Sequence, residues 1–297
     1  MRVRPAPEYT GAMGFLDHIR ACNTGDPAAY RPFAVDGVRV GWIAPSLADA
    51  LPDVDPGFIV TPDRVTLAPE LRDFESRSSA LDRAARHLVD TGVVRGLRGE
   101  HYPVMARWGA EPMMRIDRAA VTPFGVAAYG LHVNGFVRDG TGGLSVWVAR
   151  RASDRAVSPG KFDNLIGGGQ PIGLTLAENL AKEAQEEAGI DDPAIIARAV
   201  PVGAITYLMG TGLGLKPDTL FIYDLELDPG FTPVNTDGEV EAFELWPVER
   251  VMDSVRDTDA WKFNVNLVVI DFLIRHGHLT PDHPDYLDLV SGLRRPL

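Results

Sequence analysis

Three glutamates in one segment are the residues best placed to do chemistry. In LTLAENLAKEAQEEAGI, the spacing of Glu183, Glu186 and Glu187 is i, i+3, i+4, so a helix places their carboxylates side by side. These like charges repel one another, and the helix dipole near the C-terminus is unfavourable for anions. A divalent cation such as Mg²⁺ or Mn²⁺ offsets both effects, because hard cations prefer oxygen ligands and leave positions open for phosphate. The alternative interpretation is a solvated acidic helix face.

The elements that must position these glutamates are a glycine-rich segment and an amphipathic helix. Glycines occupy 167–169, a helix is predicted over 175–188, and Gly189 is a candidate C-cap. At about 100° per residue, one side of the helix forms a stripe that packs against a core, with the glutamates at its edge. The stripe consists of Leu176, Ala177, Leu180, Ala181, Ala184 and Ala188. Glu178 precedes Lys182 by four residues, a spacing that predicts an ordinary helix salt bridge.

This segment resembles the signature of the Nudix hydrolases, G-x5-E-x7-R-E-U-x-E-E-x-G-U, in which U is an aliphatic residue. The matching positions are Gly168, Glu183, Ala184, Glu186, Glu187, Gly189 and Ile190. Two positions depart from the signature, because Lys182 replaces the usual arginine and Leu174 replaces the first glutamate. The resemblance covers residues 120–275.

The resemblance implies an α/β/α sandwich with a mixed sheet and metal-dependent hydrolysis of a diphosphate bond. In the family, carboxylates matching the three glutamates bind divalent metal, and a backbone carbonyl matching Gly167 often joins them. The metal neutralises phosphate charge and lowers the pKa of the attacking water. The residue matching Lys182 orients a carboxylate, but lysine cannot make the two-pronged contact of a guanidinium. Leu174 can neither bind metal nor accept a proton.

A general base and substrate contacts must therefore come from other segments. Glu239 and Glu241 are candidates for the base, because the family often uses a carboxylate from this later region and strand alternation places both on one face. The candidate substrate contacts are Arg150, Arg151, Lys161, Asn164 and Gly168. Solvated acids, surface charges and turn caps are the alternatives for these polar side chains. Five aromatic residues either stack on a heteroaromatic ring or belong to the core: Trp147, Phe162, Tyr207, Phe221 and Tyr223.

A longer stretch is similar to a subgroup related to thiamine pyrophosphokinase-linked Nudix proteins. It includes PGKFDNLIGGGQPIGLTLAENLAKEAQEEAGI, PVGAITY, LFIYDLEL and DGEVEAFELWPVE. The subgroup has an extra N-terminal domain, and a leucine or similar residue at the position of Leu174 is a habit of that subgroup. The similarity implies cleavage of thiamine diphosphate or its oxidised analogues to the monophosphate and phosphate. The alternatives are a nucleoside diphosphate derivative as substrate, or a regulatory module that binds a diphosphate without cleaving it.

Length and composition limit the remaining function classes. The 297 residues suffice for two domains, and we predict a small α+β domain over 1–115 and the Nudix domain with a tail over 116–297. A net charge of −12 opposes non-specific binding to nucleic acid, and no apolar run approaches the ~18 residues that span a bilayer. The single Cys22 favours a reducing compartment, and residues 1–15 lack a secretory signal, so we expect a cytoplasmic protein. A homodimer is one possible assembly.

Hydrophobic periodicity and turn residues predict the order of the elements. In the first half we expect a short helix within 14–30, hairpins at 33–43 and 58–67, and a helix at 76–91. In the second half the expected strands are 126–137, 144–152, 199–209, 219–227 and 239–248. A helix at 264–277 closes the domain, and the tail ends in a short helix.

Overall fold

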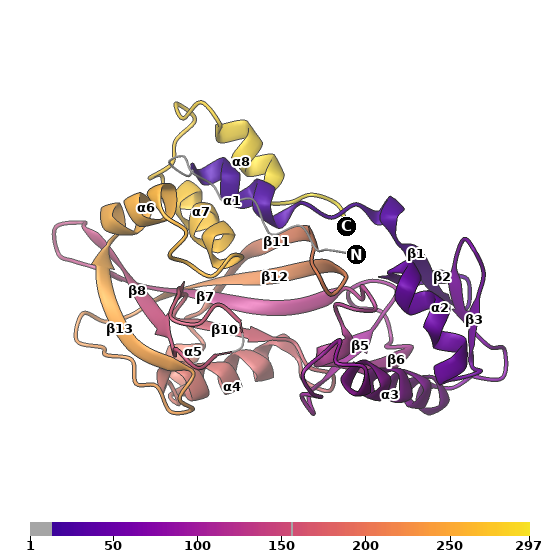
Figure 1. Ribbon diagram of the computed structural model, residues 1–297. Coiled ribbons are helices and arrows are strands. Elements are labelled where there is room, and N and C mark those ends of the chain that lie inside the picture. The colour runs from indigo at the N-terminus through magenta and orange to yellow at the C-terminus, as the bar shows by residue number, and fades with distance from the viewer. Residues whose placement is uncertain (1–13, 156) are drawn as a thin grey trace.

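The computed structural model describes residues 14–155 and 157–297 (Figure 1). The expectation that the chain starts without a secretory signal rests mainly on residues 1–13, which lie outside the described residues. Within the described ranges, no helix is both long and apolar enough to cross a bilayer.

The N-terminal unit is built around a four-stranded sheet of order β2-β1-β4-β3. The two predicted hairpins and the predicted helix at 76–91 are confirmed, because β1 pairs with β2, β3 pairs with β4, and α3 covers the helical segment. A separate two-stranded hairpin, β5–β6, follows. The bounds are β1 (Arg31–Val35), β2 (Val38–Ile43), α2 (Pro45–Val54), β3 (Phe58–Val60), β4 (Val65–Leu67), α3 (Phe74–Asp90), β5 (His101–Val104), β6 (Met114–Asp117) and the 3₁₀ turn η2 (Arg118–Ala120).

The second unit contains a seven-stranded mixed sheet, as the resemblance implies. Its order is β11-β12-β7-β8-β13, with β10 paired to β7 and β9 paired to β8. The β7–β12 pair is parallel and its neighbours are antiparallel. The strands are β7 (Ala128–Arg138), β8 (Leu144–Arg151), β9 (Phe162–Asp163), β10 (Ile166–Gly169), β11 (Val200–Gly210), β12 (Leu215–Glu226) and β13 (Val240–Pro247). All five predicted strands of this half are confirmed.

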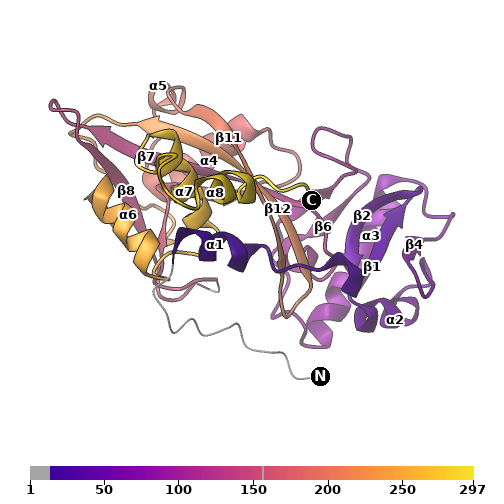
Figure 2. The same cartoon turned by 90° about the horizontal axis from the view of Figure 1, so that it is seen from above.

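Helices cover both faces of the mixed sheet and complete the expected sandwich (Figure 1). One face carries α1 (Phe15–Cys22), α6 (Val248–Asp257), α7 (Val265–Arg275) and α8 (Tyr286–Gly292), and their apolar side chains share one core with the sheet. The other face carries α4 (Leu176–Ala188) and α5 (Pro193–Ile196), which share a second core with β7 and β12. Figure 2 shows the N-terminal unit beyond one end of the sheet.

Helix α1 departs from the predicted division of the chain. It lies within the range assigned to the N-terminal domain, yet Phe15, Ile19 and Cys22 are buried in the core that includes α7 and α8. The 3₁₀ turn η1 (Pro27–Ala29) and β1 then lead into the N-terminal unit. Along the described residues, the chain therefore begins with a helix packed on the second unit, then forms the N-terminal unit, and then forms the rest of the second unit.

Local sequence defines both ends of α4. Thr175 caps the helix, because its hydroxyl accepts a bond from the Glu178 N–H at 3.2 Å and the Glu178 carboxylate accepts from the Thr175 N–H at 2.8 Å. Gly189 ends it in the left-handed conformation with φ of 66°. The expected Glu178–Lys182 salt bridge was wrong, because Glu178 serves the cap and Lys182 pairs further along the helix.

Candidate active site

Helix α4 and strand β10 approach each other so closely that β10 requires glycine. A Cβ atom placed on Gly168 would lie 2.3 Å from Cδ of Glu183, so the glutamate side chain rests directly on this residue. One residue earlier, the Gly167 N–H donates a bond of 2.7 Å to Oε2 of Glu187. The glycine segment thus positions two of the three predicted carboxylates through its backbone and its lack of side chains.

The three carboxylates lie in different environments. Glu183 and Glu187 are buried at 9% and 7% exposure, whereas the Glu186 side chain is 43% exposed. Lys182 Nζ donates to Glu186 Oε2 at 2.6 Å and to Glu183 Oε1 at 3.2 Å. Burial raises the pKa of Glu183, and burial together with the charge of Asp163 raises the pKa of Glu187 well above its usual range. Ionising both buried carboxylates therefore requires more positive charge than the surrounding side chains supply.

The donor chemistry of these three side chains suits a hard divalent cation, although their present spacing does not. All three side chains offer carboxylate oxygens, the ligands that Mg²⁺ and Mn²⁺ prefer, and the raised pKa of Glu187 shows where added positive charge would be most favourable. Within the described ranges, no three acidic, histidine or cysteine side chains are gathered tightly enough to hold a metal as they stand. The ammonium of Lys182 lies between Glu183 and Glu186 instead. The metal set of Glu183, Glu186, Glu187 and Gly167 stays a prediction.

A buried acid beside this site, Asp163, was not among the predicted site residues. Asp163 is 5% exposed and accepts from Arg151 Nη1 at 2.8 Å and Lys262 Nζ at 3.1 Å. Burial alone would raise its pKa, but Lys262, His132 and Arg151 outweigh burial and lower it. Asp163 therefore stays ionised close to Glu187, and Arg151 is committed to it. The DNL stretch before the glycines looked like turn capping, and no sequence signal linked it to Lys262.

The other predicted substrate contacts also have partners within the protein. Arg150 lies over the Phe162 ring with its Cζ at 4.6 Å from the ring centre, and Lys161 pairs with Asp259 at 3.0 Å. Asn164 is buried and donates through Nδ2 to Asn134 at 2.9 Å, while its Oδ1 lies 2.9 Å from Nδ1 of His132. Gly168 alone lies directly against a predicted metal ligand. The substrate roles of these residues stay predictions.

The two candidate bases do not share a strand face, so that expectation was wrong. Glu239 precedes β13, and a bulge between Val240 and Ala242 interrupts the alternation on which the expectation depended. Glu239 is half-buried and pairs with Arg155 at 2.6 Å. Glu241 is exposed. The structure thus separates the environments of two acids that the sequence could not tell apart.

Aromatic side chains gather where the two units meet. The Trp108 ring, from the turn of the β5–β6 hairpin, lies 4.7 Å from both Tyr129 and Phe221 between ring centres. Phe221 and Trp108 remain partly exposed. Among the other predicted stacking residues, Tyr207 and Trp147 are buried, and Phe162 packs against Trp246 and Trp261. Trp108 and Tyr129 escaped notice because Trp108 contacts residues 21 and 113 positions later in the chain, and such contacts leave no periodic pattern.

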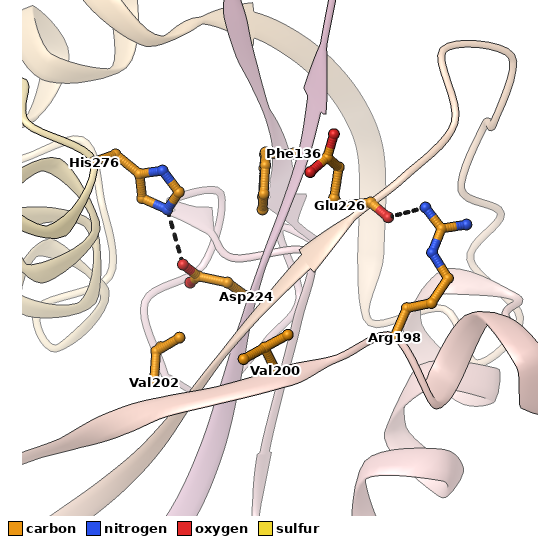
Figure 3. A pocket seen from close by; sticks show the side chains of 7 residues that line it. All are labelled: Phe136, Arg198, Val200, Val202, Asp224, Glu226 and His276. Atoms are coloured by element: carbon orange, nitrogen blue, oxygen red, sulfur yellow. Dashed lines mark hydrogen bonds and ion pairs between the residues drawn. The ribbon is translucent and has the colours of Figure 1, made fainter.

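A separate cavity of about 410 Å³ lies between β11, β12 and the end of α7 (Figure 3). Its charged groups are paired with neighbouring side chains or with the backbone. Asp224 accepts from His276 Nε2 at 2.9 Å and from Arg275, and Arg198 donates to the Glu226 carbonyl at 2.6 Å. Although burial opposes ionisation, these donors lower the pKa of Asp224 to about 2. None of the residues that line it comes from α4 or β10.

Two family models match consecutive parts of the chain, and the first of them includes α1, which packs on the second unit. A family model described as a domain of unknown function, DUF4743, matches residues 14–128, and the NUDIX domain model matches residues 128–267. Nudix hydrolase 20, chloroplastic, of Arabidopsis thaliana is 40% identical over 293 residues, which cover 95% of this chain and 78% of that protein. The uncharacterized protein YJR142W of Saccharomyces cerevisiae is 30% identical over 281 residues, which cover 88% of this chain and 82% of that protein.

Solved structures give a weaker likeness. A crystal structure of DR0079 from Deinococcus radiodurans aligns with 57% of this chain and 97% of its own at 23% identity and a TM-score of 0.41. The Nudix hydrolases at 40% identity and the NUDIX match show that this chain belongs to the Nudix hydrolase family. It is accordingly a Nudix hydrolase preceded by a DUF4743 domain. Nudix enzymes generally use divalent metal ions and act on diphosphate linkages.

Proposed function

We propose that this enzyme hydrolyses thiamine diphosphate or an oxidised analogue of it, releasing the monophosphate and inorganic phosphate. The hydrolytic part of the proposal rests on two contacts with the glycine strand: Glu183 packs on Gly168, and Glu187 accepts from the Gly167 N–H. Glu186 lies on the same helix, one turn after Glu183. The thiamine part rests on the similarity of the motifs to the thiamine-linked subgroup. An aromatic thiamine ring also suits the partly exposed cluster of Trp108, Tyr129 and Phe221.

Each side chain of the site has a defined task in this proposal. Glu183, Glu186 and Glu187 would hold Mg²⁺ or Mn²⁺, which supplies charge neutralisation and an acidified water. Gly167 fixes Glu187 through its N–H, and Lys182 holds Glu183 and Glu186 until they engage another cation. We assign the general base to Glu239, because it is half-buried and held by Arg155, whereas Glu241 is exposed.

A second candidate substrate is a nucleoside diphosphate derivative, because the aromatic cluster accepts any planar ring. A non-catalytic diphosphate sensor is the third candidate, and the specific observation in its favour is Leu174 at the position of a usual family carboxylate. Cytoplasmic location and a homodimer remain part of the proposal, supported by the single cysteine and by the frequency of dimers.

A panel assay with the full chain distinguishes these candidates. The panel contains thiamine diphosphate, its oxidised forms, ADP-ribose and a sugar nucleotide, each with Mg²⁺ or Mn²⁺, and the products are separated by chromatography. The proposal expects the highest kcat/KM on the thiamine compounds, with equal release of monophosphate and phosphate. Preferential turnover of ADP-ribose or the sugar nucleotide would show that the substrate is a nucleoside diphosphate derivative. Binding without any turnover would support the non-catalytic diphosphate sensor.

A further inference from the structure

The N-terminal unit reaches the active site through the start of the β5–β6 hairpin. The His101 carbonyl accepts a bond of 2.9 Å from the Ile172 N–H, in the loop between β10 and α4. The adjacent Tyr102 hydroxyl lies against Gly169, where an added Cβ would be only 1.6 Å from the phenol oxygen. Gly169 directly follows Gly168, the residue beneath Glu183. Figure 1 shows this hairpin beside the start of α4.

Arg118 lies over Tyr102 and keeps most of its hydrogen-bonding capacity free. Its Cζ is 5.8 Å from the centre of the Tyr102 ring, and its Nη1 donates to Glu100 at 2.8 Å. A guanidinium carries five N–H donors, and this is the one hydrogen bond its side chain makes within the described ranges. The side chain is 54% exposed, so the remaining donors face solvent. Tyr102 is 5% exposed, and no described residue forms a hydrogen bond with its hydroxyl.

The local backbone holds Arg118 in place. The Arg118 N–H donates to the Glu100 carbonyl at 2.8 Å. The preceding Asp117 is buried, and its carboxylate accepts from the N–H groups of Arg98, Gly99 and Ala119 at 2.8 to 3.2 Å. A side chain on such a braced turn loses little further freedom when it binds a ligand.

Charge around the site also favours Arg118 as a ligand group. Desolvation lowers its pKa, but the neighbouring Tyr102, Glu100 and Glu239 outweigh this and raise it, and Glu239 is the proposed general base. The other cations near the carboxylates are paired, as Arg118 is with Glu100, but their side chains are only 10–42% exposed against 54% for Arg118: Lys182 pairs with Glu183 and Glu186, Arg155 with Glu239, and Arg151 and Lys262 with Asp163. Among these described cations, Arg118 is the most exposed, and its guanidinium keeps donors that an anionic diphosphate can use.

We propose that Arg118 and Tyr102 bind the diphosphate group of the substrate, so that both units of the chain build the active site. The inference rests on the proposed diphosphate hydrolysis and deepens it. The guanidinium edge of Arg118 matches two phosphate oxygens, and the Tyr102 hydroxyl donates to a third. The N-terminal domain is then a part of the substrate site and not only a structural addition.

The test measures the affinity of the full chain for methylenediphosphonate, a non-hydrolysable diphosphate, by titration calorimetry with Mg²⁺ present. Arg118→Ala is expected to weaken binding at least tenfold, Arg118→Lys less, and Tyr102→Phe about threefold. Arg115→Ala is the control, because this arginine on β6 is only 27% exposed and pairs with two acids, Glu75 and Asp82. Unchanged affinity in Arg118→Ala and Arg118→Lys, or an equal loss in Arg115→Ala, would overturn the inference.

Turnover separates this inference from the proposed function. In Arg118→Ala, Arg118→Lys and Tyr102→Phe, we expect KM for the preferred panel substrate to rise as the affinity for methylenediphosphonate falls. The change in kcat should be smaller. A wild-type chain that turns over the panel with an unchanged KM in Arg118→Ala would contradict the inference alone. A wild-type chain that binds methylenediphosphonate through Arg118 but hydrolyses nothing would contradict the proposed hydrolysis alone.

Discussion

Oε2 of Glu187 accepts a 2.7 Å hydrogen bond from the backbone N–H of Gly167, and this bond joins the acidic helix to the glycine strand. The contact places a 7% exposed carboxylate against the edge of β10, near the ionised Asp163. One helical turn earlier, Glu183 rests on Gly168. The family signature thus has a direct physical meaning here, because the glycines make room for the carboxylates that follow them 15 to 20 residues later.

Replacing Gly168 by alanine should disturb this contact. The new Cβ would lie 2.3 Å from Cδ of Glu183, so the glutamate must move away. We expect a loss of about 1–3 kcal/mol in unfolding free energy and a clear loss of turnover. Gly140→Ala is the control, because a Cβ there meets nothing within 4 Å. Thermal unfolding and kcat/KM measure both effects, and a Gly168→Ala enzyme that matches Gly140→Ala would contradict the close approach.

The stability of the metal-free protein should depend on pH through Glu187. The pKa of this carboxyl is raised on folding, so its stabilising contribution is complete below the unfolded pKa and is lost as pH rises through the folded pKa. Metal-free Glu187→Gln should therefore be more stable than the wild type at pH 8, by at least about 2 °C in Tm, and similar at pH 4. Calorimetry in chelator checks this, and a Tm advantage that is independent of pH would argue against it.

Lys182 should be replaceable by arginine but not by alanine. Its ammonium bonds Glu186 at 2.6 Å and Glu183 at 3.2 Å, and a guanidinium can serve the same two carboxylates. We expect Lys182→Arg to keep kcat/KM within about threefold and Lys182→Ala to lose about tenfold. Because the pair is partly exposed, the unfolding free energy should fall by less than about 1 kcal/mol. Full activity in Lys182→Ala would show that this lysine does not position the carboxylates.

The two acids around β13 should differ in their effect on the reaction. Glu239 is half-buried and held by Arg155, so Glu239→Gln is expected to lower kcat by about 10²-fold or more as a lost general base. Glu241 is exposed, and Glu241→Gln should stay within about twofold. A larger loss of kcat in Glu241→Gln than in Glu239→Gln would show that Glu241 is the general base.

Periodicity and spacing predicted most of the elements and the acidic helix. Short-range patterns predicted the extents of β7, β8 and α4, and the structure has all three elements. The predicted stripe of α4 was only partly right, because Ala177 is exposed and Glu183 and Glu187 belong to the buried face instead of its edge. The bulge at Val240–Ala242 shows the limit of this method, since it changed the relation of Glu239 to Glu241 without a sequence signal. The partnership of Asp163 with Lys262, 99 residues apart, depends on tertiary packing that no local pattern encodes. Arg118 went unnoticed for the same reason.

The account depends most directly on a metal-assisted reaction at the α4 carboxylates. The decisive measurement is kcat/KM for Mg²⁺-dependent phosphate release from the preferred panel substrate by the wild type, Glu186→Gln and Glu187→Gln, with the exposed Glu249→Gln as control. The account predicts a loss of at least about 10²-fold in each α4 variant, because the metal supplies several kcal/mol of charge stabilisation, and no loss in the control. Turnover that is unaffected by Glu186→Gln and Glu187→Gln would contradict it.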